Sequence, residues 1–324
     1  MIGAGAFGRN HARVYRQLEQ EGASVELAAI VDTDAARAAA VSREFGNPPC
    51  LSLSELRGRV DAASVVVPTV EHLKIARVLM EAGIDVLIEK PLAPSLTEAD
   101  EIVRVAERTG RVVQVGHLER FNPAVRATVP LLTKPMFFEV HRLSVFTPRS
   151  LDIDVILDLM IHDLDIVLSF VDSPVKEIRA VGLPILTPRV DIANVRMEFE
   201  SGCVANFTAS RVSTERVRKL RFFQPRQYIS IDYSRQDVMV FTVDPSAAAA
   251  KASPNPGIGM QKPPVVSEEP LHAELRSFLD AVRHRTQPQV PLEDGRRALA
   301  VALDVLKEIR AHSQRVGLEK TLSS

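Results

Sequence analysis

Three side chains have residue types and positions that suit acid–base chemistry at a hydroxyl group. Lys90 follows a predicted strand, residues 85–88, and its ammonium can hydrogen-bond a hydroxyl and stabilise developing negative charge. Asp158 and His162 are four residues apart on a predicted helix over 153–170, so they share a face. A carboxylate beside a histidine orients the imidazole as a general base. Each residue also has a plainer reading, as a surface lysine before a proline or as a capping or core histidine.

The chain begins with a glycine pattern that suits dinucleotide binding. Residues 3–8 read Gly-Ala-Gly-Ala-Phe-Gly, which matches GxGxxG. The first glycine permits a tight turn, the second lets the backbone approach a pyrophosphate, and the third lets the following helix pack on the strand. Asp32 ends the next predicted strand, where a carboxylate can accept hydrogen bonds from ribose hydroxyls. The alternative is a turn without a ligand and an unrelated aspartate; the surrounding strand–helix–strand pattern favours the dinucleotide.

The residue type at Asp32 also bears on which nicotinamide cofactor binds. A carboxylate there repels the 2′-phosphate of NADP, and Thr33 and Asp34 supply no arginine to offset the repulsion. The sequence therefore favours NAD over NADP as the cofactor.

The elements that position these residues alternate between strand and helix in the first third of the chain. Short apolar strands separated by helices predict a parallel sheet covered on both faces, a doubly wound Rossmann sheet. The predicted strands are 25–31, 62–67, 85–88 and 112–115, and the predicted helices are an alanine-rich stretch ending at Phe45, then 70–82 and 96–109.

After His117 the pattern changes to a succession of alternating segments, which predicts a large, mostly antiparallel open sheet in a second α/β domain. The strand-like segments are 137–146, 175–186, 194–199, 204–210, 217–223, 228–232 and 237–243; residues 244–270 read as a loop, and 271–284 and 292–312 as helices. We therefore expect an NAD-binding Rossmann domain over 1–118 and a substrate-binding and oligomerisation domain over 119–324. A broad sheet with one uncovered face predicts a homodimer or homotetramer.

The first strand is shorter than the rest of the pattern requires. Only Met1 and Ile2 precede Gly3, whereas a first Rossmann strand needs about five residues. We expect this strand to be truncated in the given sequence and an apolar extension to precede Met1.

Composition excludes several classes of partner. The formal net charge of the 324-residue chain is -1, which argues against a broad nucleic-acid surface. No apolar run approaches the roughly 20 residues of a membrane span. The two cysteines lie far apart and fit a reducing cytoplasm, and the eight histidines show no metal-binding spacing, so no metal is expected.

Five motifs together give the chain a resemblance to the glucose-fructose oxidoreductase, inositol dehydrogenase and rhizopine-catabolism family (Gfo/Idh/MocA). They are the glycine loop, Val-Val-Val-Pro-Thr-Val-Glu-His over 65–72, Glu-Lys-Pro over 89–91, Gly-His-Leu-Glu-Arg-Phe-Asn-Pro over 116–123, and Asp158-xxx-His162-xx-Asp165. The resemblance implies that Lys90, Asp158 and His162 are catalytic and surround a substrate hydroxyl and the nicotinamide. It implies cofactor binding by Gly3, Gly5, Ala6, Phe7, Gly8, Asp32, Pro68, Thr69, His72, Glu89 and Lys90. It implies substrate binding by Lys90, His117, Arg120, Asn122, Asp158 and His162.

The implied function is NAD-dependent oxidation of a ring hydroxyl of a sugar or nucleotide sugar to a ketone. The motifs around His117 and Asp158, with Tyr-Ile-Ser-Ile-Asp-Tyr over 228–233, are similar to a bacterial branch that includes UDP-N-acetylglucosamine 3-dehydrogenases. A diphosphate needs cations, for which the candidates are Arg120, Arg142, Arg149 and Arg211. The alternatives are a dehydrogenase of a free sugar or inositol, and an NAD-binding regulator without turnover.

Overall fold

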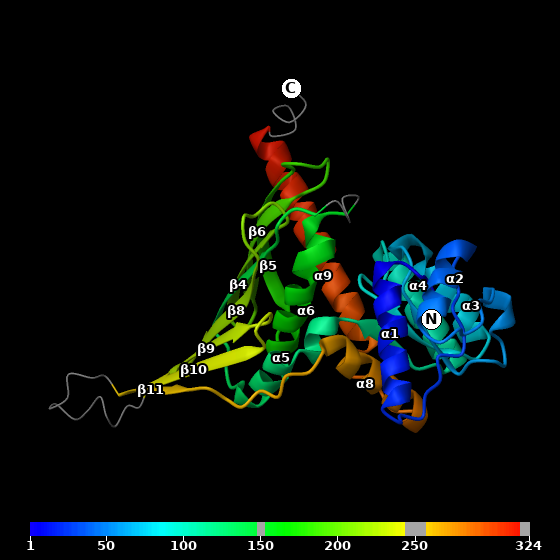
Figure 1. Ribbon diagram of the computed structural model, residues 1–324. Helices are drawn as coiled ribbons and strands as arrows, with labels where there is room; N and C mark the ends of the chain where they lie inside the picture. The colour runs from blue at the N-terminus through cyan, green and yellow to red at the C-terminus, as the bar shows by residue number, and fades with distance from the viewer. Residues whose placement is uncertain (148–152, 244–256, 318–324) are drawn as a thin grey trace. The chain divides into compact units, whose positions relative to one another are not determined.

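The computed structural model describes residues 1–147, 153–243 and 257–317, and its contacts divide the chain into two compact units (Figure 1). The first unit is Met1–Phe121 together with Glu268–Leu299, and the second is Asn122–Ser267 together with the chain from Ala300 onward. Each unit has its own sheet, and the predicted fold class is confirmed: a parallel Rossmann-type sheet in one unit and a large, mostly antiparallel sheet in the other.

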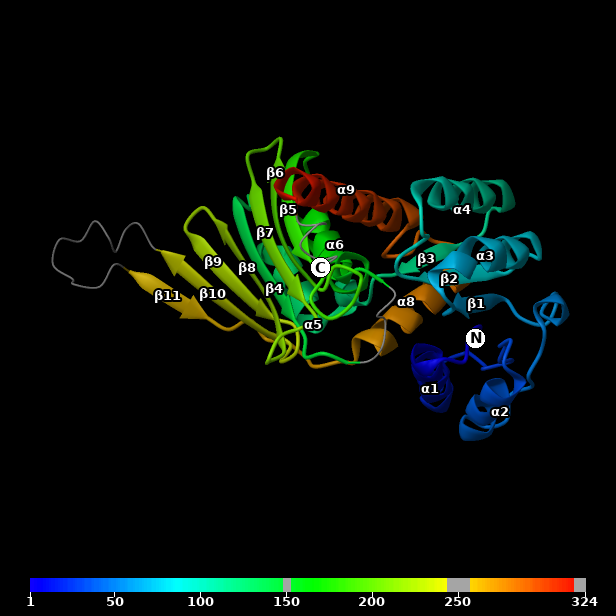
Figure 2. The same ribbon diagram turned by 90° about the horizontal axis from the view of Figure 1, so that it is seen from above.

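The first unit is built on three parallel strands in the order β1-β2-β3, namely β1 (Ala62–Val65), β2 (Asp85–Glu89) and β3 (Val113–Gly116). Every residue of β2 and β3 is buried, as expected for strands covered by helices on both faces. Figure 2 shows α3 and α4 on one side of this sheet and α1 on the other. The helices of this unit are α1 (Ala6–Gln20), α2 (Ala35–Glu44), α3 (His72–Glu81), α4 (Leu96–Thr109), α8 (Pro270–His284) and the start of α9 (Leu292–Val316), with short 3-10 turns η1 (Leu53–Glu55), η2 (Thr69–Glu71) and η3 (Leu118–Phe121).

The first two residues of the chain occupy the central position of the sheet. Ile2 makes parallel bridges to Val31 on one side and to Val65 on the other. Its backbone N–H donates to the carbonyl of Ser64 at 2.9 Å, and its carbonyl accepts from the N–H of Val66 at 2.8 Å. The turn that begins at Gly3 is therefore anchored on both sides.

The predicted strand over 25–31 is wrong for residues 25–29. Only Ile30 and Val31 make bridges, to Cys50 and Ile2 respectively. The N–H of Val25 is instead used in a local turn with Ala23. An apolar segment becomes a strand only where the backbone of a neighbouring segment hydrogen-bonds with it. Here such a neighbouring segment is present only at the end of the run, beside residues 30 and 31.

Helix α8 groups with the first unit although it follows the second unit in sequence. Leu271, Leu275 and Phe278 on α8 are buried in one cluster with Val14 and Leu18 of α1. The predicted boundary at residue 118 assigned all later residues to a second domain, whereas contacts place Glu268–Leu299 with the first unit. The grouping follows from the apolar faces of α1 and α8, because these two faces pack against each other and bury each other's side chains.

The second unit contains an eight-stranded sheet in the order β11-β10-β9-β8-β4-β7-β6-β5, in which only β4 and β7 pair in parallel. Its strands are β4 (Phe137–Leu143), β5 (Val175–Leu183), β6 (Ile192–Phe199), β7 (Val204–Ser210), β8 (Val217–Gln224), β9 (Gln227–Asp232), β10 (Asp237–Val243) and β11 (Ile258–Gln261). Strand β11 lies within the predicted loop 244–270, so that prediction is wrong there. All four of its residues are exposed, and such a short edge strand lacks the alternation by which strands are recognised.

Helices cover one face of this sheet (Figure 1). They are α5 (Pro123–Thr128), the 3-10 turn η4 (Val129–Leu131), a π-helical segment η5 (Ile156–Met160), α6 (Ile161–Phe170) and the later part of α9. Burial alternates residue by residue along β4, β6 and β9, which is the pattern of strands with one covered face. No helix in the described ranges combines the length and the apolarity that a membrane crossing requires.

Candidate active site

The glycine loop at the start of the chain is held by close backbone contacts. Gly3 has a positive φ of +92°, and a Cβ there would lie 2.1 Å from the carbonyl oxygen of Val66. A Cβ on Gly8 would lie 1.7 Å from the carbonyl oxygen of Gly3. A Cβ on Gly5 would meet no described atom within 4 Å, so this glycine borders open space. Gly3 thus makes the tight turn and Gly8 the close helix packing that the motif predicts, and Gly5 leaves the open space that a ligand would need.

Helix α1 presents its N-terminus at this loop. Gly5 is the N-cap, has no side chain to cap the helix, and accepts the first helical hydrogen bond, from the N–H of Arg9 at 2.9 Å. The first turn therefore lacks both an acidic residue and a side-chain cap. Backbone N–H groups at Ala6, Phe7 and Gly8 and the positive end of the helix dipole are suited to bind an anion such as a pyrophosphate.

Asp32 is fixed beside the loop by four hydrogen bonds. Its carboxylate accepts from the backbone N–H of Ala4 at 2.6 Å and from that of Asp34 at 2.8 Å. Arg37, on the first turns of α2, donates to both carboxylate oxygens, at 3.1 and 2.7 Å. Burial alone raises the pKa of Asp32, but the hydrogen bonds from Arg37 and the backbone outweigh it and lower the pKa to about 2. Asp32 is therefore ionised at neutral pH.

Arg37 is a residue that sequence reasoning missed. The sequence offers no arginine at positions 33 and 34, whereas the first turn of α2 brings the side chain of residue 37 to the Asp32 carboxylate. Asp34 caps α2 by accepting from the N–H of Arg37, which is the signal that could have placed this arginine on the first helical turn.

The segment after β1 contributes a buried histidine that joins two loops. Pro68 is the N-cap of η2, Thr69 begins that turn, and His72 begins α3. The imidazole of His72 lies 3.0 Å from the carbonyl oxygen of Val67 and 3.3 Å from that of Leu92. Burial lowers the pKa of His72, and a neutral ring can donate to only one of these two carbonyl oxygens. The imidazole thus lies between the loop after β1 and the chain just beyond Glu-Lys-Pro.

Glu89, at the carboxyl end of β2, anchors the strand that precedes Lys90. Its Oε1 lies 3.0 Å from Nε2 of His11, a fully buried residue of α1. A Cβ on Gly116 would lie 2.8 Å from the Glu89 carboxyl carbon, so a larger residue at that position would require this carboxylate to shift. His11 thus links α1, the helix after the glycine loop, to the strand that precedes Lys90. The sequence does not reveal this role, because no motif around His11 indicates its partner.

A second buried carboxylate, Glu274 of α8, lies in the same unit. Its side chain is fully buried, and burial together with the charge of Glu89 raises its pKa well above the usual value. The amide of Gln114 donates to the backbone carbonyl of Glu274 at 3.3 Å, which fixes α8 against β3. Sequence patterns gave no signal for Glu274, because it is an ordinary helical glutamate until α8 packs on the sheet.

Three predicted substrate contacts lie at the junction of β3 with the following turns. His117 is buried directly after β3. Arg120 donates to the carboxylate of Asp294 at 3.0 Å and is largely buried. Asn122 is the N-cap of α5, accepting from the N–H of Ala124, and its amide donates to the carbonyl of Tyr233 at 3.1 Å.

Asp158 and His162 lie on consecutive helical segments of the second unit, and both are partly buried. Asp158 belongs to the π-helical segment η5, and His162 is the second residue of α6. The predicted helix over 153–170 is therefore helical from 155 onward but begins with a π segment, which the sequence did not predict. Such π-helical segments are rare in proteins overall, but many of those known lie at functional sites. The wider turn changes the direction in which the following side chains point.

Three of the four cations proposed for a diphosphate, Arg120, Arg142 and Arg211, have carboxylate neighbours within their own units. Arg142 makes a two-bond salt bridge with Asp163, the neighbour of His162, at 2.6 and 2.9 Å, and lies over the ring of Tyr233. Arg211 lies near Asp191, and Arg149 lies outside the described residues. The Arg142–Asp163 pair is buried and fixes α6 to β4. Within the described ranges, no group of three His, Cys, Asp or Glu side chains has a metal-binding arrangement.

The predicted site residues are therefore distributed over both units. The first unit brings together the glycine loop and Asp32, joined by the Ala4–Asp32 bond, and carries Lys90, His117 and Arg120. The second unit carries Asn122, Asp158 and His162.

Comparison with known proteins gives matches over most of the chain. Residues 1–117 match a family described as an oxidoreductase family with an NAD-binding Rossmann fold, and residues 137–229 match the GFO/IDH/MocA C-terminal domain. A UDP-N-acetylglucosamine 3-dehydrogenase of Acidithiobacillus ferrooxidans is 36% identical over 97% of this chain and 98% of its own. A scyllo-inositol 2-dehydrogenase (NAD(+)) of Bacillus subtilis is 28% identical over 66% of this chain and 67% of its own.

A solved structure with the same fold is that of UDP-N-acetylglucosamine 3-dehydrogenase GnnA from Acidithiobacillus ferrooxidans. It is 35% identical, covers 96% of both chains and has a TM-score of 0.87.

Proposed function

Because the chain belongs to the Gfo/Idh/MocA family of oxidoreductases, we propose that it is an NAD-dependent dehydrogenase that oxidises the 3-hydroxyl of UDP-N-acetylglucosamine to a ketone. The observation that carries the choice of substrate is the similarity, over nearly the whole length of both chains, to a UDP-N-acetylglucosamine 3-dehydrogenase. Its extent includes the second unit, where substrate selectivity is expected to be set in a two-domain dehydrogenase.

The first unit fits the cofactor. Gly5 borders open space at the N-terminus of α1, which suits the pyrophosphate, and the ionised Asp32 suits the adenosine ribose hydroxyls. The nicotinamide ring, when bound, supplies the hydride acceptor. Arg37 offsets the charge of Asp32, so the preference for NAD rests on the ability of this carboxylate to accept from the ribose 2′-hydroxyl, which NADP replaces with a phosphate.

The chemistry requires that the substrate lose a hydride from carbon and a proton from oxygen. We assign proton removal to His162, which is four residues after Asp158 on the same helical stretch. Asp158 supports the imidazolium that forms, and Lys90 hydrogen-bonds the oxygen as its negative charge develops. Loss of hydride and proton together leaves the ketone, and no metal ion is needed to balance the reaction.

The test is a turnover assay that follows NADH formation with UDP-N-acetylglucosamine, myo-inositol and glucose as separate substrates. We expect turnover with the nucleotide sugar. The inositol alternative has one supporting observation, the similarity to scyllo-inositol 2-dehydrogenase over two thirds of the chain. Turnover with inositol alone would select that alternative, and absence of turnover with all three would contradict the proposed function.

We also propose assembly into a homodimer or homotetramer through the uncovered face of the eight-stranded sheet. Phe138 and Phe222 stack at 5.3 Å and contact Phe170 of α6, so their neighbours Phe137 and Phe223 point to the opposite face. An aromatic stripe crosses that face, with ring centroids 5.0–5.8 Å apart; it consists of Phe137, Phe223, Tyr228 and Phe241. A partly exposed apolar stripe across four strands suits a second copy of the chain.

A further inference from the structure

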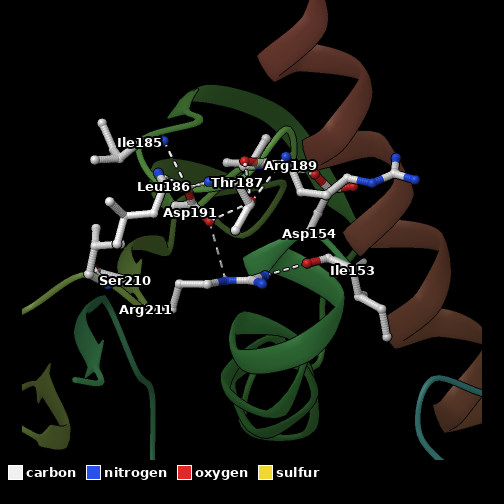
Figure 3. Close-up of polar contacts among 11 residues, drawn as sticks. Ile153, Asp154, Ile185, Leu186, Thr187, Arg189, Asp191, Ser210 and Arg211 are labelled. Carbon is white, nitrogen blue, oxygen red and sulfur yellow. Dashed lines mark hydrogen bonds and ion pairs between the residues drawn. The ribbon is translucent and has the colours of Figure 1, made fainter. Parts of the chain in front are cut away.

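A buried carboxylate closes the turn between β5 and β6 in the second unit (Figure 3). Asp191 is fully buried, and its Oδ2 accepts from three successive backbone N–H groups, those of Ile185, Leu186 and Thr187, at 2.8, 2.6 and 2.9 Å. Its Oδ1 accepts from the hydroxyl of Thr187 at 2.8 Å. Burial would raise the pKa of Asp191, but the backbone hydrogen bonds outweigh burial and lower it, so the carboxylate is ionised.

Arg211, just beyond the end of β7, extends this cluster. Its backbone N–H donates to the carbonyl of Asp191 at 3.0 Å, and its Nε lies 3.7 Å from Oδ1 of the same residue. Its Nη2 donates to the backbone carbonyl of Ile153. The arginine is 5% exposed, so one buried cation bridges the turn and the chain that enters the helical segment.

Two further hydrogen bonds join the same turn to the start of the helix. The N–H of Val190 donates to Oδ1 of Asp154, and the N–H of Val155 donates to the carbonyl of Val190, both at 2.9 Å. The carbonyl of Asp154 in turn accepts from the N–H of Asp158 at 3.1 Å. The turn over 184–190 is thus clamped to residues 153–155, one helical turn before Asp158.

The buried Asp191–Arg211 ion pair is expected to affect the arrangement of the backbone around it more than the free energy of unfolding. Isolated buried ion pairs add little to stability relative to apolar residues, but they fix one arrangement of the groups they bond. Here the bonded groups include the entry to the π-helical segment. The bonds from Val190 to Asp154, from Val155 to Val190 and from Arg211 to Ile153 all hold residues that immediately precede that segment.

We propose that Asp191 and Arg211 are positioning residues: through the clamp on residues 153–155 they hold the helical segment that carries Asp158 and His162 in the orientation required for hydride transfer. This inference rests on the proposed function in that Asp158 and His162 act on the substrate. Neither Asp191 nor Arg211 contacts the reacting atoms in this account.

The decisive variant is Asp191→Asn. The carbonyl oxygen of asparagine can still accept from the three turn N–H groups, but its NH2 group faces the arginine, donor against donor. The turn is therefore kept while the side-chain ion pair with Arg211 is lost, and the backbone bond from the Arg211 N–H to the Asp191 carbonyl remains. We expect kcat with the preferred substrate to fall about 10- to 100-fold, with the Kd for NADH unchanged. Amide hydrogen exchange over 153–160 should become faster.

A second variant, Asp154→Ala, removes the acceptor for Val190 and leaves Asp191 intact. It should shift the same two readouts in the same direction, and it keeps the test available if Asp191→Asn does not fold. The matched control is Glu198→Gln, an acid-to-amide change on β6 that breaks an ion pair with Lys176 at the sheet surface. The control should leave kcat and the exchange of residues 153–160 at parental values.

Parental kcat in folded Asp191→Asn and Asp154→Ala would overturn the proposal, even if their melting temperatures fall, because a purely structural clamp predicts that outcome. Unchanged exchange over 153–160 would overturn it as well. If the parent protein oxidises none of the three test substrates, the proposed function fails, while the exchange comparison still decides whether the clamp holds residues 153–160.

Discussion

At the scale of single residues, the roles assigned to His162 and Lys90 can be separated from cofactor binding. His162→Asn and Lys90→Ala should each lower turnover by about 100-fold or more, because one removes the base and the other the group that stabilises charge on oxygen. His162 belongs to the second unit, whereas the glycine loop and Asp32 belong to the first. NADH binding, measured by fluorescence titration, should therefore survive in His162→Asn. Near-parental turnover in either variant removes that residue from the mechanism.

The Asp32–Arg37 pair makes a sharper prediction about cofactor choice than Asp32 alone. In the parent, the carboxylate holds Arg37 at 2.7–3.1 Å and so keeps this cation from pairing with a 2′-phosphate. Asp32→Ser should release Arg37 to pair with that phosphate, and adding Thr33→Arg should strengthen the effect. We expect the ratio of the Kd values for NADPH and NADH to shift at least tenfold toward NADPH. Because the pKa of Asp32 is about 2, the parental preference should not change between pH 7 and 9, where the 2′-phosphate, with a second pKa of about 6, also keeps its charge.

The control for this experiment is Arg37→Gln in the Asp32→Ser background, which should abolish the gain in NADPH binding. A parent that binds NADPH as tightly as NADH would contradict the proposed role of Asp32.

The site residues that sequence could indicate are those whose chemistry is local. The glycine loop and Asp32 follow from spacing, since each glycine acts within one turn of chain. Arg37 and His11 could not be predicted in the same way, because their partners, Asp32 and Glu89, are set by how helix and strand pack. Glu274 has no local signal at all; only burial against the sheet changes its chemistry.

At the scale of elements, Glu274 makes the packing of α8 sensitive to pH. A carboxyl whose pKa is raised on folding keeps a proton that the unfolded chain releases above its ordinary pKa of 4.5. The folded state then binds more protons than the unfolded state, so stability contributed at this site falls as the pH rises above 4.5. Glu274→Gln cannot release a proton, so its melting temperature relative to the parent should increase from pH 5 to pH 8. The control, Glu81→Gln on an exposed pair with Arg108, should show no such trend.

A constant difference in melting temperature between Glu274→Gln and the parent across that range would show that Glu274 titrates normally. A difference that shrinks with rising pH would reverse the sign and contradict the burial argument.

Helices and strands were predicted correctly where the apolar periodicity of the sequence was strong. The prediction was wrong where strand formation depended on whether a neighbouring segment was present to pair with. Helices α3 and α4 and the strands from β4 to β10 were found from apolar spacing. Residues 25–29 are apolar enough for a strand, yet they lack a ladder along their length. Strand β11 forms by pairing with β10 despite its weak pattern. The π-helical turn at 156–160 was not predicted, because single-residue propensities do not distinguish a π-helical turn from an α-helical one.

At the scale of the whole molecule, the uncovered sheet face carries the prediction of assembly. The stripe Phe137–Phe223–Tyr228–Phe241 is continuous, and Phe223 is 37% exposed. Burying such rings against a second copy gains about 25 cal/mol for each Å² of apolar surface removed from water. A charge in the middle of the stripe would instead have to be buried unpaired.

If the parent assembles through this face as proposed, Phe223→Glu should give a species of smaller mass than the parent, measured by light scattering at micromolar concentration. The fold of each chain should persist, because Phe222, not Phe223, faces α6 and the core. Val129→Glu is the matched control: it also introduces a charge at an exposed apolar residue of the second unit, but it lies on η4, away from the stripe. It should leave the mass unchanged. A parent protein that is monomeric at this concentration, or a Phe223→Glu variant with the parental mass, would contradict assembly through this face.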